Sequence, residues 1–277
     1  MTDSAPATLR VRRPELTFEP TTWTWTPAAP EISAVADAIS LAMPSIEPYV
    51  VRSIRAVHGR LAEPLHSDAR TYAIQESAHH ALHRRYNDSL RSNGRGVAPI
   101  EHMTEAICRR LERCSEHFNV AFAAGFEAVA FAAARWVDPR VDRLFADAEP
   151  QPSSLFLWHL AEEAEHKGVA HSVMRAIGVK RRTYLVALII ALTVLATVTF
   201  AGTIVFLAHQ RRLWNPWSWF RIIVWTFSYL FVALPMCAMS MSRSYHPDQL
   251  SDPTSLRWWL LRFDDSTRTF PAWDSVG

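Results

Sequence analysis

The sequence has few cysteines, little net charge and almost no strand-like alternation of polar and apolar residues. Its three cysteines are an odd number without a C-x-x-C pair, which excludes a disulfide scaffold and fits a reducing cytoplasm. The formal net charge of +2 comes without a clustered basic face, so no nucleic-acid partner is expected. Residues 1–30 lack the apolar core of a signal peptide and are expected to form a flexible N-terminal arm. The lack of strand signals predicts an all-α fold.

Two stretches place a carboxylate three residues before an imidazole. Glu76 precedes His79 in QESAHHALH, and Glu163 precedes His166 in WHLAEEAEH. Residues i and i+3 share one face of a helix, so each pair can bind the same metal ion. Two such pairs on separate helices are the ligand pattern of four-helix bundles that hold two iron or manganese ions.

That pattern also requires one carboxylate from each of the two remaining helices. Glu47 lies in SLAMPSIEPYVVRSIR, where we expect a helix to restart after Pro44 with Ser45 as its N-cap. Glu127 lies in VAFAAGFEAVAFAAA, and its neighbours within four positions are all Ala, Val, Phe or Gly. A free carboxylate is costly to bury among such residues, so Glu127 is expected to be protonated, paired or bound to metal. Given the two Glu-x-x-His pairs, metal is the preferred partner.

Two further histidines extend the predicted ligand faces. His83 follows His79 by four residues, and His159 precedes Glu163 by four. Each histidine therefore lies one turn along the same helix face. Both are predicted metal ligands, and extra nitrogen ligands favour a catalytic centre over an iron store. The same spacing also suits residues that orient the ligating carboxylates without binding metal.

These motifs carry a family resemblance. The segments MPSIEPYVVRSIR, IQESAHHALHRRYND, GFEAVAFAAA and LWHLAEEAEHKGVAH resemble the bacterial family named "predicted metal-dependent hydrolase", of the ferritin-like superfamily. The resemblance covers roughly residues 30 to 180. It implies a ferritin-like four-helix bundle with a dimetal site, whose ligands would be Glu47, Glu76, His79, Glu127, Glu163 and His166. The H-x-x-x-E-x-x-H segment is also similar to a ligand helix of diiron N-oxygenases that oxidise arylamines.

A long apolar region follows the motifs. Tyr184 to Ala208 is uncharged and would form a helix of ~37 Å, which exceeds the ~30 Å hydrocarbon core of a bilayer. Ile222 to Met241 is uncharged as well, so we predict a transmembrane helical hairpin. Lys180, Arg181 and Arg182 precede it directly, which predicts attachment to the inner (cytoplasmic) membrane with the bundle facing the cytoplasm. The alternative is a pair of buried helices in an enlarged soluble bundle.

The predicted organisation follows from these patterns. Helical periodicity is expected at roughly 45–62, 67–90, 98–136 and 153–177. The predicted parts are a flexible arm at 1–30, a ferritin-like dimetal bundle at 31–178, a membrane hairpin at 179–242 and a C-terminal tail at 243–277.

Two chemistries are open for such a centre. In the favoured one, two iron ions, or iron with manganese, activate O2 and oxidise an apolar small molecule, with electrons from an unknown donor. In the alternative, a metal-activated water hydrolyses the substrate, and zinc is then also suitable. Glu76 and Glu163 are the predicted catalytic residues because they would bridge the ions, whereas Glu47 and Glu127 would bind one ion each. A homodimer is left open.

Overall fold

The computed structural model describes residues 9–19, 24–92, 96–242 and 244–273, and this part of the chain is helical without β-strands. Its extended pairing is limited to an isolated bridge between Asp264 and Thr269. The helices that carry the predicted ligands are α1 (Pro30–Val57), α2 (Leu65–Ser92), α4 (Glu116–Val137) and α6 (Pro150–His166). The others are α3 (Ala98–Leu111), α5 (Val141–Leu144), α7 (Val169–Ala176), α8 (Arg181–His209), α9 (Pro216–Ser240) and α10 (Thr254–Leu260). The all-α prediction is confirmed.

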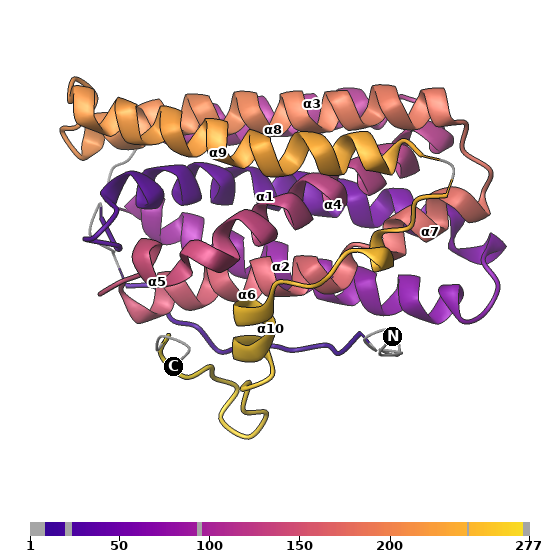
Figure 1. The fold of residues 1–277 in the computed structure, drawn as a ribbon, viewed down its shortest axis with the longest axis horizontal. Helices are drawn as coiled ribbons and strands as arrows, with labels where there is room; N and C mark the ends of the chain where they lie inside the picture. The colour runs from indigo at the N-terminus through magenta and orange to yellow at the C-terminus, as the bar shows by residue number, and fades with distance from the viewer. Residues whose placement is uncertain (1–8, 20–23, 93–95, 243, 274–277) are drawn as a thin grey trace.

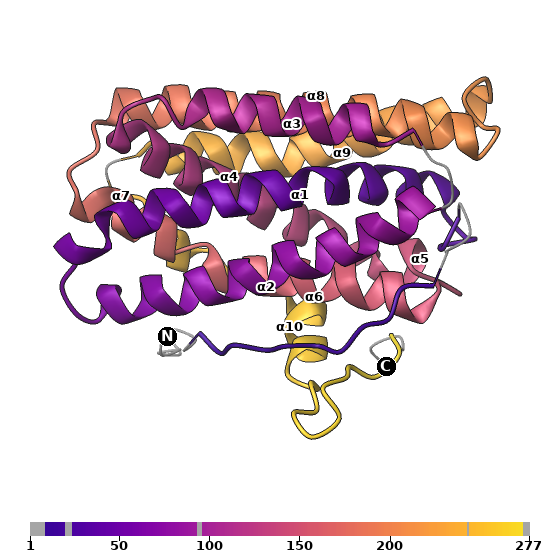
Figure 2. The ribbon, with the colours of Figure 1, turned by 180° about the vertical axis from the view of Figure 1, so that it is seen from behind.

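The long helices lie in layers (Figure 1). α8 and α9 both lie along one face of the ligand-bearing helices, where α8 packs against α1 and α4 and α9 packs against α4. The view from behind places α3 next to α8 in the same outer layer (Figure 2). α10 lies on the opposite face of the molecule in both views.

The helix that carries Glu47 is longer than the sequence predicted. α1 starts at Pro30 and continues through Pro44 and Pro48, so the expected restart at Ser45 is wrong. A proline removes the hydrogen bond that its N–H would give to the carbonyl four residues earlier. For Pro44 that carbonyl belongs to Ser40, and the side chain of Asn87 on α2 donates to it at 2.9 Å. Packing against α2 thus supplies the donor that the proline lacks.

Two predicted helices are interrupted. The expected helix at 98–136 is divided into α3 and α4, and Ser115 caps the second by accepting a hydrogen bond from the Phe118 N–H. The expected helix at 153–177 is divided into α6 and α7 by a turn at Lys167 and Gly168. Glycine has a low helix propensity, which favours this interruption.

The N-terminal segment contacts the bundle where it is described, while residues 1–8 and 20–23 of the predicted arm lie outside the described residues. The Arg12 side chain is buried between Glu162 and Glu165 of α6. Trp25 is fully buried and stacks on Phe156, with ring centroids 5.1 Å apart. The predicted domain boundaries stay a prediction.

Three segments are long and apolar enough to cross a membrane: Glu116–Leu144, Arg181–His209 and Pro216–Ser240. They differ in environment, because 78% of the most apolar stretch of the first is buried inside the molecule, against 33% and 11% for the other two. The bundle core therefore accounts for the apolar character of α4. The apolar surfaces of α8 and α9 stay largely open.

Candidate metal centre

Each of the four ligand-bearing helices brings its predicted residues to one buried region. Glu47 comes from α1 and Glu127 from α4, while α2 and α6 each contribute three residues. The predicted set is Glu47, Glu76, His79, His83, Glu127, His159, Glu163 and His166, and all eight are buried. His159 is the most exposed of them, at 8%. Which of these residues bind metal stays a prediction.

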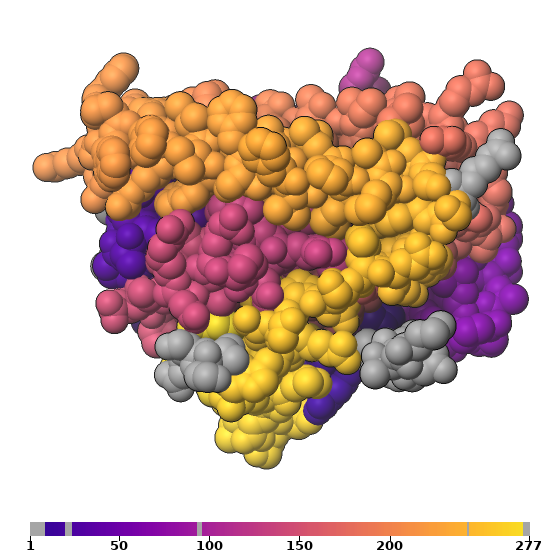
Figure 3. All heavy atoms as spheres, in the orientation of Figure 1, coloured from indigo at the N-terminus to yellow at the C-terminus, as the bar shows by residue number. Residues whose placement is uncertain are grey.

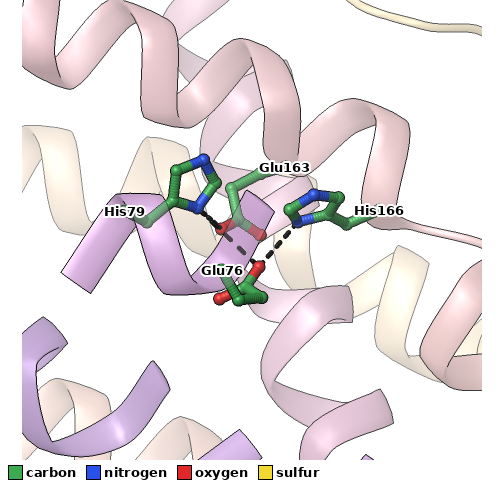
Figure 4. A group of neighbouring side chains, drawn as sticks. All are labelled: Glu76, His79, Glu163 and His166. Carbon is green, nitrogen blue, oxygen red and sulfur yellow. Dashed lines mark ion pairs between the residues drawn. The ribbon is translucent and has the colours of Figure 1, made fainter. Parts of the chain in front are cut away.

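The two Glu-x-x-His pairs face each other across α2 and α6 (Figure 4). Glu76, His79, Glu163 and His166 each offer one donor atom within 4.8 Å of the others. The Nδ1 atom of His79 lies 3.8 Å from Glu76 Oε1 and 3.9 Å from Glu163 Oε1. His166 Nδ1 lies 2.7 Å from Glu76 Oε1. Donor atoms that share one ion at about 2.1 Å are themselves about 3 Å apart, so these separations suit metal ligands.

A second group adjoins the first. Glu47, His83 and His159 also place one donor atom each within 4.8 Å of one another. The Nε2 atom of His159 lies 2.8 Å from Glu163 Oε1 and 3.4 Å from Glu47 Oε1, so this imidazole links the two groups. His83 is placed behind it, with its Nε2 2.7 Å from His159 Nδ1 and its Nδ1 2.8 Å from Ser40 Oγ.

Glu127 approaches the first group from α4. Its Oε2 atom lies 4.0 Å from His166 Nδ1. Its other oxygen accepts a hydrogen bond of 2.5 Å from the Tyr72 hydroxyl. Tyr72 is fully buried and precedes Glu76 by four residues, one turn back on the same helix face. The tyrosine therefore orients Glu127 and leaves one carboxylate oxygen directed at the cluster.

His79 has a buried partner outside the cluster. Its Nε2 lies 3.0 Å from Glu162 Oε2, and Glu162 Oε1 accepts a hydrogen bond of 3.1 Å from Arg12. Arg12 also binds Glu165, so the N-terminal segment fixes two carboxylates of α6. A histidine that donates from Nε2 to a carboxylate presents the lone pair of Nδ1 to a metal. This is the nitrogen of His79 that faces Glu76 and Glu163.

The electrostatics of the cluster favour a bound cation. Burial raises the pKa of the Glu47 carboxyl well above its ordinary value, and the Glu76 carboxylate raises it further. Burial and Glu76 also raise the pKa of Glu163 to about 8. Burial lowers the pKa of the His166 imidazole, but Glu76, Glu163 and Glu127 outweigh burial and raise this pKa to about 10. A divalent ion would reverse the penalty on the carboxylates by stabilising their ionised forms.

Unpaired donor atoms provide the test of whether this site fits metal. Buried polar atoms almost always have a hydrogen-bond partner, so a convergence of unpaired ones calls for an explanation. The cluster contains such atoms on all four carboxylates and on two imidazoles. They are Glu47 Oε1 and Oε2, Glu76 Oε2, Glu127 Oε2, Glu163 Oε2, His79 Nδ1 and His166 Nε2, while Glu76 Oε1 and His166 Nδ1 face each other at 2.7 Å. Mixed oxygen and nitrogen donors of this kind suit iron, manganese and zinc. The residues present therefore fit metal ions.

A family comparison agrees with this geometry. The model of the family described as "Predicted metal-dependent hydrolase" matches residues 10–251. The chain belongs to this family. The resemblance predicted from the motifs is thus confirmed at the family level. No curated protein and no solved structure matches the chain.

Several residues around the centre were not predicted from the sequence. Tyr72 stands one turn from a predicted ligand, at i−4 to Glu76, so helical spacing could have indicated it. The spacing of Glu162, at i−4 to His166, allowed it as a ligand in place of Glu163. The structure places Glu162 against His79 and Arg12. Arg12 had no such signal because it reaches the site from a segment without regular structure. Tyr86, one turn beyond His83, is fully buried and donates a 2.6 Å hydrogen bond to Asp37.

Proposed function

We propose that the buried cluster holds two divalent metal ions and that the protein is a metal-dependent hydrolase. The observation that carries this proposal is the set of unpaired oxygen and nitrogen atoms that converge from α1, α2, α4 and α6. The description of the family supports hydrolysis over oxidation. Under this proposal Glu76 and Glu163 would hold both ions, Glu47 and Glu127 would hold one ion each, and the helices would form a ferritin-like bundle.

The chemistry that bound ions supply is polarisation of a carbonyl group and acidification of a bound water. The surrounding residues position the ligands for it. Glu162, held by Arg12, fixes the ring of His79 through a 3.0 Å contact. His83 fixes the ring of His159 in the same way, through a 2.7 Å contact, and Ser40 holds His83 through a contact of 2.8 Å. In this arrangement His83 acts on His159, and it becomes a ligand only if their contact opens.

The exposure of His159 indicates the side from which substrate approaches. The other predicted ligands are between 0% and 1% exposed, whereas His159 is 8% exposed. A carbonyl group would therefore reach the cluster past this imidazole. The apolar helices α8 and α9 support attachment to a membrane and an apolar substrate, such as an ester or amide with a long hydrocarbon chain. Lys180, Arg181 and Arg182 before α8 support the inner membrane with the bundle in the cytoplasm.

Oxidation by O2 is the second candidate, and the placement of the ligands favours it. Two Glu-x-x-His pairs with two further glutamates, all borne on helices, are the ligand set of di-iron and di-manganese carboxylate bundles. This reading requires an external electron donor, which hydrolysis does not. The two candidates share their ligands and differ in whether the metal changes its redox state.

Anaerobic turnover separates the two candidates. The protein is purified, its metal content is measured, and zinc-loaded protein is assayed without O2 against esters and amides of long-chain carboxylic acids. We expect two ions per chain and cleavage at a rate that O2 does not change. Glu163→Gln should lose cleavage and metal, whereas Glu105→Gln, on the exposed face of α3, should retain both.

Two results would contradict hydrolysis. Zinc protein that cleaves nothing, together with reduced iron protein that consumes O2 in the presence of substrate, would establish oxidation. Protein that binds no metal under any loading condition would refute both candidates, since each depends on the same ligands.

A further inference from the structure

The outer surfaces of α8 and α9 are apolar, and together we call them the hairpin face. On α8 the exposed residues recur every three or four positions, from Val186 and Ile189 to Phe200. On α9 they follow the same spacing, and Phe231 reaches 81% exposure. Both helices lie in the outer layer (Figure 3), and near the turn between them Phe200 of α8 and Phe220 of α9 line one groove. The large members are Val186, Ile189, Phe200, Trp217, Phe220, Ile223, Val224, Phe227, Phe231, Leu234 and Met239.

α8 is bound lengthwise to the bundle. Near its start, a Cβ on Gly125 of α4 would lie 2.9 Å from the Leu188 backbone, so only glycine allows this approach. Near its end, a Cβ on Gly202 would lie 2.6 Å from the Cβ of Ala38 on α1. Leu188 and Gly202 are about 21 Å apart along the helix at 1.5 Å per residue. Close contacts at these two points therefore hold the middle half of α8 against the bundle.

Polar bonds hold α9 to the same bundle. Glu31, at the start of α1, is fully buried and accepts hydrogen bonds from Ser218 and Arg221 at 2.5 and 3.2 Å. Ten residues after Ser218, Ser228 accepts a 2.7 Å hydrogen bond from Trp136 of α4. Removing the hairpin from the bundle would break these bonds and leave Glu31 without its partners.

A hairpin bound in this way cannot cross a bilayer alone. If α8 stood perpendicular to the membrane, the helices beside it would enter the hydrocarbon at the same depth. α3 is one of these helices, and its surface carries the exposed ion pair of Glu105 with Arg109. Charged groups are costly to place in hydrocarbon. The exposed rows occupy one side of each helix while the other side packs on the bundle, so only one side of the hairpin is open to lipid.

Charge indicates the partner of the hairpin face. The sequence contains no Asp or Glu between Glu165 and Asp248, whereas basic residues flank the two uncharged stretches of this interval. Lys180, Arg181 and Arg182 lie at one end of the hairpin, and Arg211 lies at the other. Basic residues at the ends of an apolar face suit a layer of anionic headgroups above acyl chains.

We propose that the hairpin face lies flat on an anionic lipid bilayer, with α8 and α9 parallel to the membrane plane. This inference rests on the proposed membrane attachment and differs from the crossing hairpin that the sequence predicts. Trp214 is 91% exposed at the turn between the helices. In this orientation it lies at the level of the lipid headgroups, and the whole bundle stays on one side of the membrane. A groove of about 820 Å³ next to Trp214, between Phe200 and Trp219, receives part of an acyl chain.

Depth measurements along α8 test the orientation. Spin labels are placed singly at Val186, Thr193 and Phe200 of the full-length protein, with the native cysteines replaced by alanine, on vesicles that contain phosphatidylglycerol. We expect the three labels to lie at the same depth within a few Å and to contact lipid. The middle of a crossing helix would fall near Ala196. Thr193 and Phe200 would then both lie roughly 10 Å deeper than Val186, and this result would overturn the proposal.

The other outcomes are also decisive. Labels that contact neither lipid nor water would mean that a second copy of the chain covers the hairpin face, which refutes the proposal. Protein that does not bind vesicles at all would refute membrane attachment itself. A label at Leu261, which is 66% exposed beside α10 on the opposite face, should contact only water.

Charge variants test the partner. Phe227→Glu and Phe231→Glu replace exposed side chains, so helix content should stay unchanged while vesicle binding falls at least tenfold. Leu261→Glu makes the same kind of change away from the hairpin face and should leave binding unchanged. Binding should also weaken on neutral phosphatidylcholine vesicles and at high salt. Equal binding by all three variants, without dependence on salt or lipid charge, would contradict a surface-bound hairpin.

Discussion

Replacing Arg12 provides a sharp test of how the metal centre is held. The guanidinium is 3% exposed and makes three hydrogen bonds of 3.0 to 3.1 Å, one to Glu162 and two to Glu165. Removing one partner of a buried ion pair costs about 3 to 5 kcal/mol, because the other charge stays buried without compensation. We therefore expect Arg12→Met to lower the free energy of unfolding by about that amount. Arg12→Lys keeps the charge but loses the paired geometry, so it should lower the free energy of unfolding by an intermediate amount.

Metal affinity should fall in the same variant. Glu162 fixes the ring of His79, and partners of this kind typically contribute about 10- to 100-fold to metal affinity. The free energy of unfolding is measured on metal-free protein by urea titration with circular dichroism, and affinity by competition with a chromophoric chelator. Arg10→Met is the matched control, because Arg10 pairs with Asp265 at the surface and should contribute at most about 1 kcal/mol. Equal behaviour of Arg12→Met and Arg10→Met would refute the positioning role.

Three further predictions concern the centre and its packing. Chelation of the metal should lower the thermal midpoint while helix content persists, since the unpaired carboxylates of the cluster then lose their cation; an unchanged midpoint in calorimetry would contradict metal binding. Tyr72→Phe should lower the free energy of unfolding by about 1 to 3 kcal/mol and weaken metal binding, because Glu127 loses a 2.5 Å hydrogen bond. Equal metal affinity of variant and parent in chelator titrations would contradict this role. Gly202→Ala should cost about 1 to 3 kcal/mol in urea unfolding by forcing a contact with Ala38, whereas Gly59→Ala, with open space around it, should be nearly neutral.

The helix boundaries show where local patterns are insufficient. Proline at position 44 normally indicates a break, and nothing nearby in the sequence contradicts that reading. α1 nevertheless continues, because Asn87 of another helix donates to the carbonyl that the proline leaves free. In the opposite direction, the apolar periodicity over 98–136 hides the break that Ser115 caps. Such boundaries depend on single hydrogen bonds that periodicity does not encode.

The metal centre was more predictable than the helix ends. The spacing of Glu76 with His79, and of Glu163 with His166, places each pair on one helix face whatever surrounds it. The structure brings both pairs together, and it brings Glu47 and His159 to the same cluster. Helical spacing is a local property, so the sequence was sufficient for these positions. It was not sufficient for Arg12, which reaches the site from a segment without periodic structure.

The sequence alone was enough to predict the ligand faces, the apolar character of residues 184–208 and 222–241, and an all-α fold, because each depends on residues within a few turns of one another. The partners of those faces depended on the packed structure. It directs Glu127 to the cluster through Tyr72, fixes His79 through Glu162, and brings α8 against Gly125 of α4 and Ala38 of α1. Contacts between distant segments follow from how whole helices fit together, and no local pattern contains that information.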